Sequence, residues 1–325
     1  MQIFKNILCV VAAESGNEAA LERAAALANT NQARLTVVEV IDEIPPNTKL
    51  LDRVLFPEIK AKILEVHRKG LEELVAPWNK HVEIQTKLLV GIGFLEIIRE
   101  VLRNGCDLVI KTTESSELLD RVFGSDDMHL LRKCPCPVWL VNSKSPKAYR
   151  RILAAVDVDD CYESAEINTR NILNHQIIET ASSLALSEFA KLHIVHAWKA
   201  IGEDEMRAGL VDTPEEKIVA YVEEMELQHR QNLNTLMDDT IGGMEQIALE
   251  NINPNTHLLK GSPRKVIPAF ADEIEADLLV MGTVSRTGIP GFFMGNTAEA
   301  IYYQINCSVF AIKPSGFETP VTIEA

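Results

Sequence analysis

No run of 18 consecutive apolar residues occurs in the 325-residue chain, so the sequence predicts no helix that spans a membrane. Basic residues are also scarce, because 32 Lys and Arg face 47 Asp and Glu and leave a formal net charge of −15. That balance argues against nucleic acid or an anionic membrane surface as the main partner. Hydrophobic residues nevertheless make up 46% of the chain, which excludes a disordered protein and leaves a small-molecule ligand or a protein as the expected partner.

The first residues, MQIFKNILCVVAA, carry one lysine and only a short apolar core before a run of glutamates begins. An export signal has a basic start, a longer apolar region and a cleavage site, so we interpret residues 7–11 as a buried strand. We therefore expect a cytoplasmic protein whose six cysteines stay reduced. Cys134 and Cys136 form a C-x-C pair without the second ligand pair of a structural zinc site, which favours packing over a metal or redox role.

Several motifs of known chemistry are missing from the sequence. It contains no G-x-S-x-G, H-E-x-x-H or G-x4-G-K-[ST] pattern, which removes support for a serine hydrolase, a zinc protease or a P-loop enzyme. His193 and His196 are three residues apart on an expected strand and should face opposite sides of the sheet, so they make a poor metal pair. We predict neither catalytic residues nor a metal site.

An internal repeat organises the chain. The segment KNILCVVA near the start corresponds to RRILAAVD near the middle, and CPVWLV in the first half corresponds to CSVFAI in the second. Between these landmarks, Gly91 and Asp107 correspond to Gly261 and Asp277 at a constant offset. Ordered landmarks at a nearly constant offset indicate a duplicated unit.

Each copy alternates short apolar runs with amphipathic stretches. In the second copy we expect strands at residues 152–158, 192–198, 257–260, 278–282 and 308–313. Helices are expected at about residues 169–190, 214–236, 263–275 and 297–304. This alternation is typical of parallel βαβ units, so the fold class is α/β, with two tandem five-stranded parallel-sheet sandwiches.

The polar stretch NSKSPK at residues 142–147 is the expected linker. We place a first domain at residues 1–144 and a second at residues 148–325. The acidic excess lies entirely in the second half: residues 1–151 hold 21 basic and 20 acidic side chains, which leaves 11 and 27 for residues 152–325.

The sharpest local feature is MGTVSRTGIPGFFMGNT at residues 281–297, which follows an expected buried strand and opens a helix. Ligands of open parallel sheets bind beyond the carboxyl ends of the strands, where such loops lie. Gly282 lets backbone approach a ligand closely, and Gly295 should leave bare N–H groups at the helix start. Asn296 and Thr297 can cap the helix or contact a phosphate. From spacing alone, a phosphate site and an ordinary surface loop both remain open.

This segment resembles the nucleotide loop of the universal stress protein family, G-x2-G-x9-G-[S/T], and both repeats follow that family's order of strands and helices. The resemblance implies an adenine-nucleotide alpha hydrolase-like fold and ATP, with or without Mg²⁺, as the ligand of the second domain. It also implies that the last strands of the two halves, residues 138–141 and 309–312, pair as an internal pseudo-dimer; the resemblance sets no higher oligomer.

By the same resemblance, Asp157 would hold the sugar or base, and Val156 and Ala197 would line the adenine. Met281, Gly282, Ser285, Arg286, Gly295, Asn296 and Thr297 would form the phosphate side of the site. Two positions depart from the family pattern, because Ser285 replaces the second motif glycine and Asn296 replaces the final Ser or Thr. A serine there is costly only where the backbone needs a positive φ.

The first half lacks most of this pattern. Ala12 stands at the position of the acidic residue, Thr112 at that of the first loop glycine, and only Gly124 and Ser125 remain of the final motif. We therefore expect no nucleotide in the first domain.

The predicted function is that of a stress-response binding protein, which senses or regulates through ATP held in the second domain and has at most weak ATP hydrolysis. The alternative is a scaffold, or a binder of an apolar small molecule, in which Ser285 has ended phosphate contact. Two long excursions, at residues 41–58 and 199–213, either cover a cavity or cap the core. An adenylyl-transfer enzyme ranks last, since no catalytic motif supports it.

Overall fold

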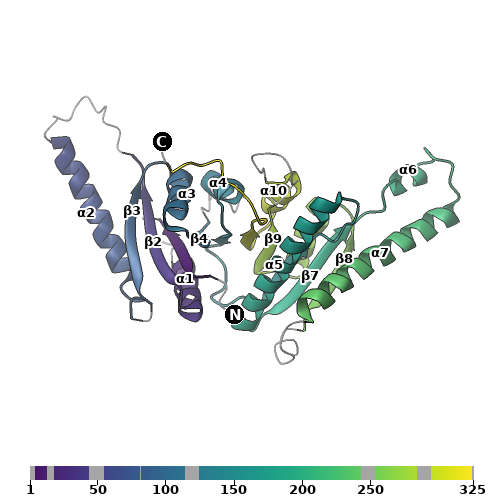
Figure 1. Cartoon of the computed structure of the whole chain (residues 1–325), viewed down its shortest axis with the longest axis horizontal. Coiled ribbons are helices and arrows are strands. Elements are labelled where there is room, and N and C mark those ends of the chain that lie inside the picture. Colours follow the sequence, from purple (N-terminus) through teal and green to yellow (C-terminus); the bar gives the residue numbers. More distant parts are fainter. Residues whose placement is uncertain are drawn as a thin grey trace. The chain divides into compact units, whose positions relative to one another are not determined.

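The computed structural model describes residues 4–12, 18–43, 55–80, 82–113, 124–242, 253–283 and 294–323. The chain divides into two compact units (Figure 1). Unit 1 comprises Met1–Lys147, Ser308–Ala311 and Glu318–Ala325, and unit 2 comprises Ala148–Cys307 and Ile312–Phe317. Among the described residues, no helix is both long enough and apolar enough to cross a membrane.

The sheet of unit 1 is built from five parallel strands in the order β3-β2-β1-β4-β5. Their bounds are Asn6–Val11 for β1, Arg34–Ile41 for β2, Ile84–Val90 for β3, Leu108–Thr112 for β4 and Val138–Val141 for β5. The helices are α1 at Glu18–Asn31, α2 at Leu55–Val75, α3 at Gly93–Asn104 and α4 at Ser125–Lys133. Every residue of β1 is buried, as expected of a strand covered by helices on both faces.

The strand β10, Ser308–Ile312, pairs antiparallel with β5. Val309 lies opposite Leu140, and the Phe310 ring packs 5.5 Å from that of Trp139. This confirms the predicted pairing of the two last strands, and it covers an apolar edge that would otherwise be exposed.

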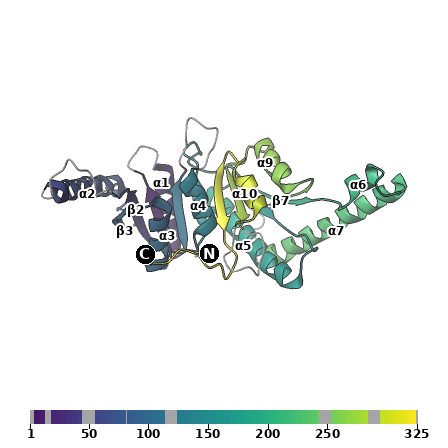
Figure 2. The ribbon, with the colours of Figure 1, turned by 90° about the horizontal axis from the view of Figure 1, so that it is seen from above.

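Unit 2 contains four parallel strands in the order β9-β6-β7-β8. They are β6 at Arg151–Val156, β7 at Lys191–Trp198, β8 at Asn255–Lys260 and β9 at Leu278–Gly282. The helices are α5 at Ser164–Glu188, α6 at Glu203–Arg207, α7 at Glu215–Ile241, α9 at Pro263–Glu273 and α10 at Asn296–Tyr302. In Figures 1 and 2, α6 and the start of α7 extend beyond the sheet of this unit.

Two contacts recur in both repeats and account for landmarks of the duplicated sequence. The Asp107 carboxylate accepts hydrogen bonds from the N–H groups of Lys5 and Asn6 at 2.7 and 3.0 Å. Asp277 does the same for Arg150 and Arg151 at 2.7 and 2.9 Å. These aspartates satisfy the first amides of β1 and β6 and so fix the start of each central strand.

Glycines at matching positions make the second recurrent contact. Gly91 has a φ of +140° and Gly261 a φ of +143°, which side chains rarely tolerate. Each donates its N–H to the end of a strand, Gly91 to Ile41 and Gly261 to Trp198. A turn of the same shape thus leads into α3 and into α9.

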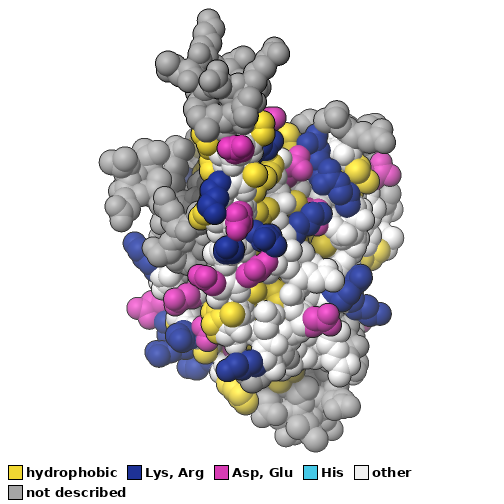
Figure 3. Space-filling model, turned by 90° about the vertical axis from the view of Figure 1, so that its left-hand side faces the viewer, with side chains coloured by type: hydrophobic (Ala, Val, Ile, Leu, Met, Phe, Trp, Pro, Cys, Tyr) yellow, Lys and Arg dark blue, Asp and Glu magenta, His cyan; other side chains and the backbone are white. Residues whose placement is uncertain are grey.

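The near-neutral composition of the first half is visible on the surface of unit 1. On the face of unit 1 that carries α2, basic and acidic side chains are intermixed (Figure 3). Glu65 lies 3.3 Å from Lys62 and 3.0 Å from Lys69, and Arg68 lies 3.8 Å from Glu72. Such exposed pairs add little stability, but they balance the charge of this face.

Candidate functional site

A cleft of about 890 Å³ opens at the carboxyl ends of β6, β7 and β9 in unit 2. This volume lies within the usual range for small-molecule sites. Apolar side chains of α5, α9, α10 and β9 form part of its wall, and most of its charged side chains lie after β6 and in the first turns of α5. The apolar lining includes Leu173, Ile177, Ile267, Met281, Ala298 and Ile301, and the charged lining consists of Asp157, Asp159, Glu163, Glu166, Arg170 and Lys199.

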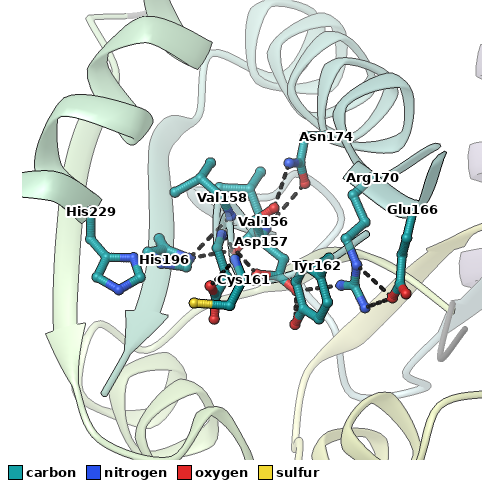
Figure 4. A network of polar contacts seen from close by, with 11 residues as sticks. Val156, Asp157, Val158, Cys161, Tyr162, Glu166, Arg170, Asn174, His196 and His229 are labelled. Carbon is teal, nitrogen blue, oxygen red and sulfur yellow. Dashed lines mark hydrogen bonds and ion pairs between the residues drawn. The ribbon is translucent and has the colours of Figure 1, made fainter. Parts of the chain in front are cut away.

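Asp157 follows β6 directly and is held by the backbone as well as by its side chain. Its N–H donates to Asn174 Oδ1 at 3.0 Å, and Asn174 Nδ2 donates to its carbonyl at 2.8 Å (Figure 4). Asn174 projects from α5 and is buried. Because the buried side-chain amide of Asn174 satisfies both the N–H and the carbonyl of Asp157, it fixes the end of β6 at the cleft.

The Asp157 carboxylate is shared by two other side chains of this region. Tyr162 donates its hydroxyl to Oδ2 at 3.2 Å, and Arg170 contacts the same oxygen through Nη1 (Figure 4). Arg170 also donates to Glu166 through Nε at 3.1 Å and Nη2 at 2.7 Å. Its guanidinium carbon lies 3.7 Å from the centre of the Tyr162 ring, a close cation–π contact.

The protonation states of this network follow from burial and from Asp157. Burial raises the pKa of the Tyr162 phenol, and the Asp157 charge raises it further, so the hydroxyl stays protonated and donates. Burial opposes the charge on Arg170, but Asp157 and Glu166 outweigh it and raise the guanidinium pKa. The network therefore keeps one cation between two carboxylates at neutral pH.

Two pairs of histidines lie on opposite faces of the sheet, as the alternation of β7 predicted. His196 Nε2 lies 3.1 Å from Nδ1 of His229 on α7, and both rings are buried. His193 Nδ1 lies 3.0 Å from Nε2 of His257 and packs near Phe270 of α9. Burial lowers the pKa of His196, and this ring, which also lines the cleft, is neutral at physiological pH.

Eight of the ten residues expected in the site line this one cleft: Val156, Asp157, Ala197, Met281, Gly282, Gly295, Asn296 and Thr297. Ser285 and Arg286 lie outside the described residues. Gly295 precedes this helix, and its own N–H donates to the Thr283 carbonyl at 3.1 Å. The following residues open α10, whose first amides have no acceptor within the helix.

Sequence reasoning missed the residues that hold Asp157, which are Tyr162, Glu166, Arg170 and Asn174. The signal was present, since Glu166, Arg170 and Asn174 recur every four residues and thus share one helix face. The expected helix, however, began at Thr169, whereas α5 begins at Ser164. That shift hid the first turn, in which Glu166 lies.

The excursions between strand and helix are only partly described. Residues 44–54 lie outside the described residues, so the role of the first excursion stays a prediction. In the second excursion, Lys199 and Ile201 line the cleft, whereas Leu210 is 77% exposed and is not part of its lining. The second excursion thus borders the cleft through its first residues alone.

Groups of side chains that could together bind a metal ion are few in the described part of the chain. The only group of three such side chains there is Asp159, Asp160 and Cys161, whose ligand atoms lie within 4.8 Å of one another at the cleft rim. Magnesium is usually held by one or two carboxylates together with substrate phosphates. Asp159 and Asp160 are the residues of this group that could supply such oxygens.

Unit 1 has a buried ion pair where unit 2 has cleft lining. Lys111 Nζ lies 2.8 Å from Oδ1 of Asp127, and the Asp127 side chain is fully buried. The sequence repeat aligns Lys111 with Met281 and Asp127 with Ala298, both of which line the cleft. The first repeat thus places a charged pair at positions where the second repeat presents apolar surface to a ligand site.

Comparison with known proteins agrees with this fold over nearly the whole chain. The model of the universal stress protein family matches twice, at residues 3–142 and 148–313. The chain is 32% identical over 321 residues to the universal stress protein E homolog of Haemophilus influenzae, which covers 96% of this chain and 98% of that protein. Universal stress protein E of Escherichia coli is 29% identical over 336 residues, covering 100% and 98%.

A solved structure shows the same likeness in three dimensions. The crystal structure of a putative universal stress protein from Pseudomonas aeruginosa superposes with a TM-score of 0.66 at 25% sequence identity. The match covers 96% of this chain and 94% of that one. With two matches of the family model in tandem, the chain belongs to the universal stress protein family.

Proposed function

We propose that unit 2 binds an adenine nucleotide, ATP, and that the protein acts in the stress response as a sensor or regulator through that occupancy. The observation that carries the proposal is a single cleft lined by Asp157, Gly282 and the residues 295–297. These segments are far apart in the sequence, yet all lie at the carboxyl ends of parallel strands, where nucleotides bind in related folds. Asp157 would contact the sugar, and the start of α10 would contact the phosphates.

Charge sets a condition on this proposal. The described lining holds four carboxylates against Arg170 and Lys199, and Arg170 is already paired with Asp157 and Glu166. A triphosphate therefore needs further positive charge, which Mg²⁺ or Arg286 would supply at contact distance. We expect MgATP to bind more tightly than free ATP.

Contacts with neighbouring side chains occupy three of the lining groups that could act as a general base in ATP hydrolysis. Asp157 and Glu166 are engaged by Arg170, and His196 is engaged by His229. A general base needs to lie within hydrogen-bond reach of the water that it activates and free to take its proton. We accordingly propose binding with at most weak ATP hydrolysis.

The apolar side of the cleft favours a second candidate function. Leu173, Ile177, Ile267 and Ile301 are all part of the lining. A site of this composition also suits an apolar small molecule held without phosphate contacts. In that case Ser285 would mark a phosphate loop that no longer binds, and the protein would act as a scaffold or as a binder of such a molecule.

Calorimetric titration of the full chain with ATP, with and without Mg²⁺, separates the two candidates. Gly295→Val adds a side chain at the phosphate end, and we expect it to abolish the heat of ATP binding. Gly124→Val is the matched control at the aligned position of unit 1; the φ angles of −60° at Gly295 and −73° at Gly124 suit valine at both sites. Absence of binding by the unaltered chain at millimolar MgATP would refute the nucleotide proposal and leave the apolar ligand.

A further inference from the structure

The Asp157 side chain is held tightly and yet remains open to the cleft. Its Oδ2 accepts from Tyr162 and Arg170, and its Oδ1 accepts from the Asp159 N–H at 3.2 Å. A carboxylate offers about four acceptor positions, and these contacts occupy three. The side chain is 41% exposed, so the remaining position is accessible from the cleft.

Arg170 decides what that open position can recognise. An unpaired carboxylate beside Glu166 would attract cations, whereas a carboxylate already neutralised by a guanidinium is suited to neutral hydrogen-bond donors. Arg170 is only 14% exposed and is fixed on its other side by Glu166 and the Tyr162 ring. It is therefore placed to hold the carboxylate in one orientation rather than to follow it.

We propose that Arg170 and Tyr162 are positioning residues that orient the open edge of the Asp157 carboxylate towards the cleft. In this orientation the carboxylate makes the cleft selective for a ligand hydroxyl donor, namely a ribose hydroxyl of the nucleotide. This inference rests on the proposed nucleotide binding, in which Asp157 contacts the sugar, and adds the two residues that orient its carboxylate. It predicts that the cleft separates ribose from a sugar without hydroxyl groups, and that this separation depends on Arg170.

The test compares the affinities of the full chain for MgATP and for the magnesium complex of 2′,3′-dideoxy-ATP by calorimetry. A hydrogen bond to a charged acceptor predicts that ATP binds about tenfold or more tightly. In Arg170→Met the ratio of the two affinities should fall towards one, because the released carboxylate turns into solvent. Arg170→Lys keeps the charge and loses the planar fork, so an intermediate ratio is expected.

Two further variants distinguish positioning from general damage to the protein. Arg207→Met removes an arginine that also bonds two carboxylates, Glu203 and Glu215, but lies outside the cleft lining, and it should leave both affinities unchanged. Tyr162→Phe removes one donor to Asp157 while keeping the ring under Arg170, and it should lower the ratio by a smaller factor. Circular dichroism melting curves identify any variant that fails to fold.

The outcomes separate this inference from the function on which it rests. If the unaltered chain binds neither nucleotide, the proposed function fails and the inference fails with it. If the chain binds both nucleotides equally, or if the folded variants at Arg170 and Tyr162 keep the full preference for ATP, nucleotide binding stands and the role of Arg170 is refuted. A ratio that falls in Arg170→Met and stays unchanged in Arg207→Met supports it.

Discussion

Replacement of the buried pair of unit 1, Lys111 and Asp127, by the residues that unit 2 carries at the aligned positions tests how the two repeats diverged. The changes are Lys111→Met, Asp127→Ala and both together, which copy Met281 and Ala298. Lys111 Nζ and Asp127 Oδ1 lie 2.8 Å apart, with the two side chains 10% and 0% exposed. Because neither charge has ready access to water, each depends on the other.

The expected magnitudes follow from that dependence. Each single substitution leaves a buried charge without its partner and should lower the free energy of unfolding by about 3–5 kcal/mol. The double substitution removes both charges, and it deprives the Gly124 N–H of the Asp127 acceptor that it reaches at 3.1 Å. Losing that hydrogen bond costs about 1–3 kcal/mol, so the double variant should be more stable than either single one.

Urea denaturation followed by tryptophan fluorescence measures these differences in the full chain. Trp198 lies in unit 2, so the series is best made in a Trp198→Phe background, where Trp78 and Trp139 report on unit 1. The double-mutant cycle should give a coupling energy of roughly 3 kcal/mol or more, above the usual range for neighbouring residues. A double variant as unstable as the sum of the two single ones would refute the reasoning.

Three further outcomes are expected. Burial lowers the pKa of His196, and also the pKa values of His193 and His257 on the other face of the sheet. The unfolded chain therefore binds protons more readily than the folded one. The free energy of unfolding should fall as the pH drops below about 6.5, by at most about 1.4 kcal/mol per pH unit for each histidine. Urea denaturation between pH 5 and 8 measures this slope, and His196→Gln should reduce it; an unchanged slope contradicts the assignment. In Gly282→Ala the new Cβ would lie 2.4 Å from Leu173 Cδ2, which should lower the free energy of unfolding by about 1–3 kcal/mol. In a Leu173→Ala background this clash is absent, so Gly282→Ala should cost less there. An equal cost of Gly282→Ala in both backgrounds would contradict the reasoning. Cys161 is the only exposed cysteine of the six, and its hydrogen bond with Asp159 raises its thiol pKa. Mass spectrometry should therefore show that iodoacetamide labels Cys161 alone, faster at alkaline pH and more slowly with bound MgATP. Equal labelling of a buried cysteine would contradict this.

The fold was predictable because the repeat, the apolar strands and the glycine landmarks are local signals. The strand at residues 278–282 was predicted with the bounds that β9 has, since it lies between Asp277 and a glycine-containing loop. Helix ends were less predictable: α7 continues to Ile241, five residues beyond the expected end, and stops where two glycines follow. Nothing in the apolar periodicity marks Leu236 as its last residue.

The candidate site was predictable only where a motif marks it. Residues of the glycine loop and the first strand line one cleft, because parallel strands bring their carboxyl ends to one edge of the sheet. Arg170 and Tyr162 carry no such motif, and their contact with Asp157 depends on the side-chain positions that the first turns of α5 fix. Periodicity identifies the face of a helix, but it does not identify which acidic residue an arginine on that face will contact.

The two repeats keep the same anchors and differ at the ends of the strands where unit 2 has its cleft. Asp107 and Asp277 hold the starts of the central strands alike, and Gly91 and Gly261 make the same turn. At the opposite ends of the strands, unit 1 has a buried charge pair in which Lys111 neutralises Asp127 from within the chain. Unit 2 has apolar lining at the aligned positions and keeps its carboxylates at the rim of an open cleft. The same scaffold thus carries a buried charge pair in one copy and an open cleft in the other, which is the difference that the proposed binding in unit 2 requires.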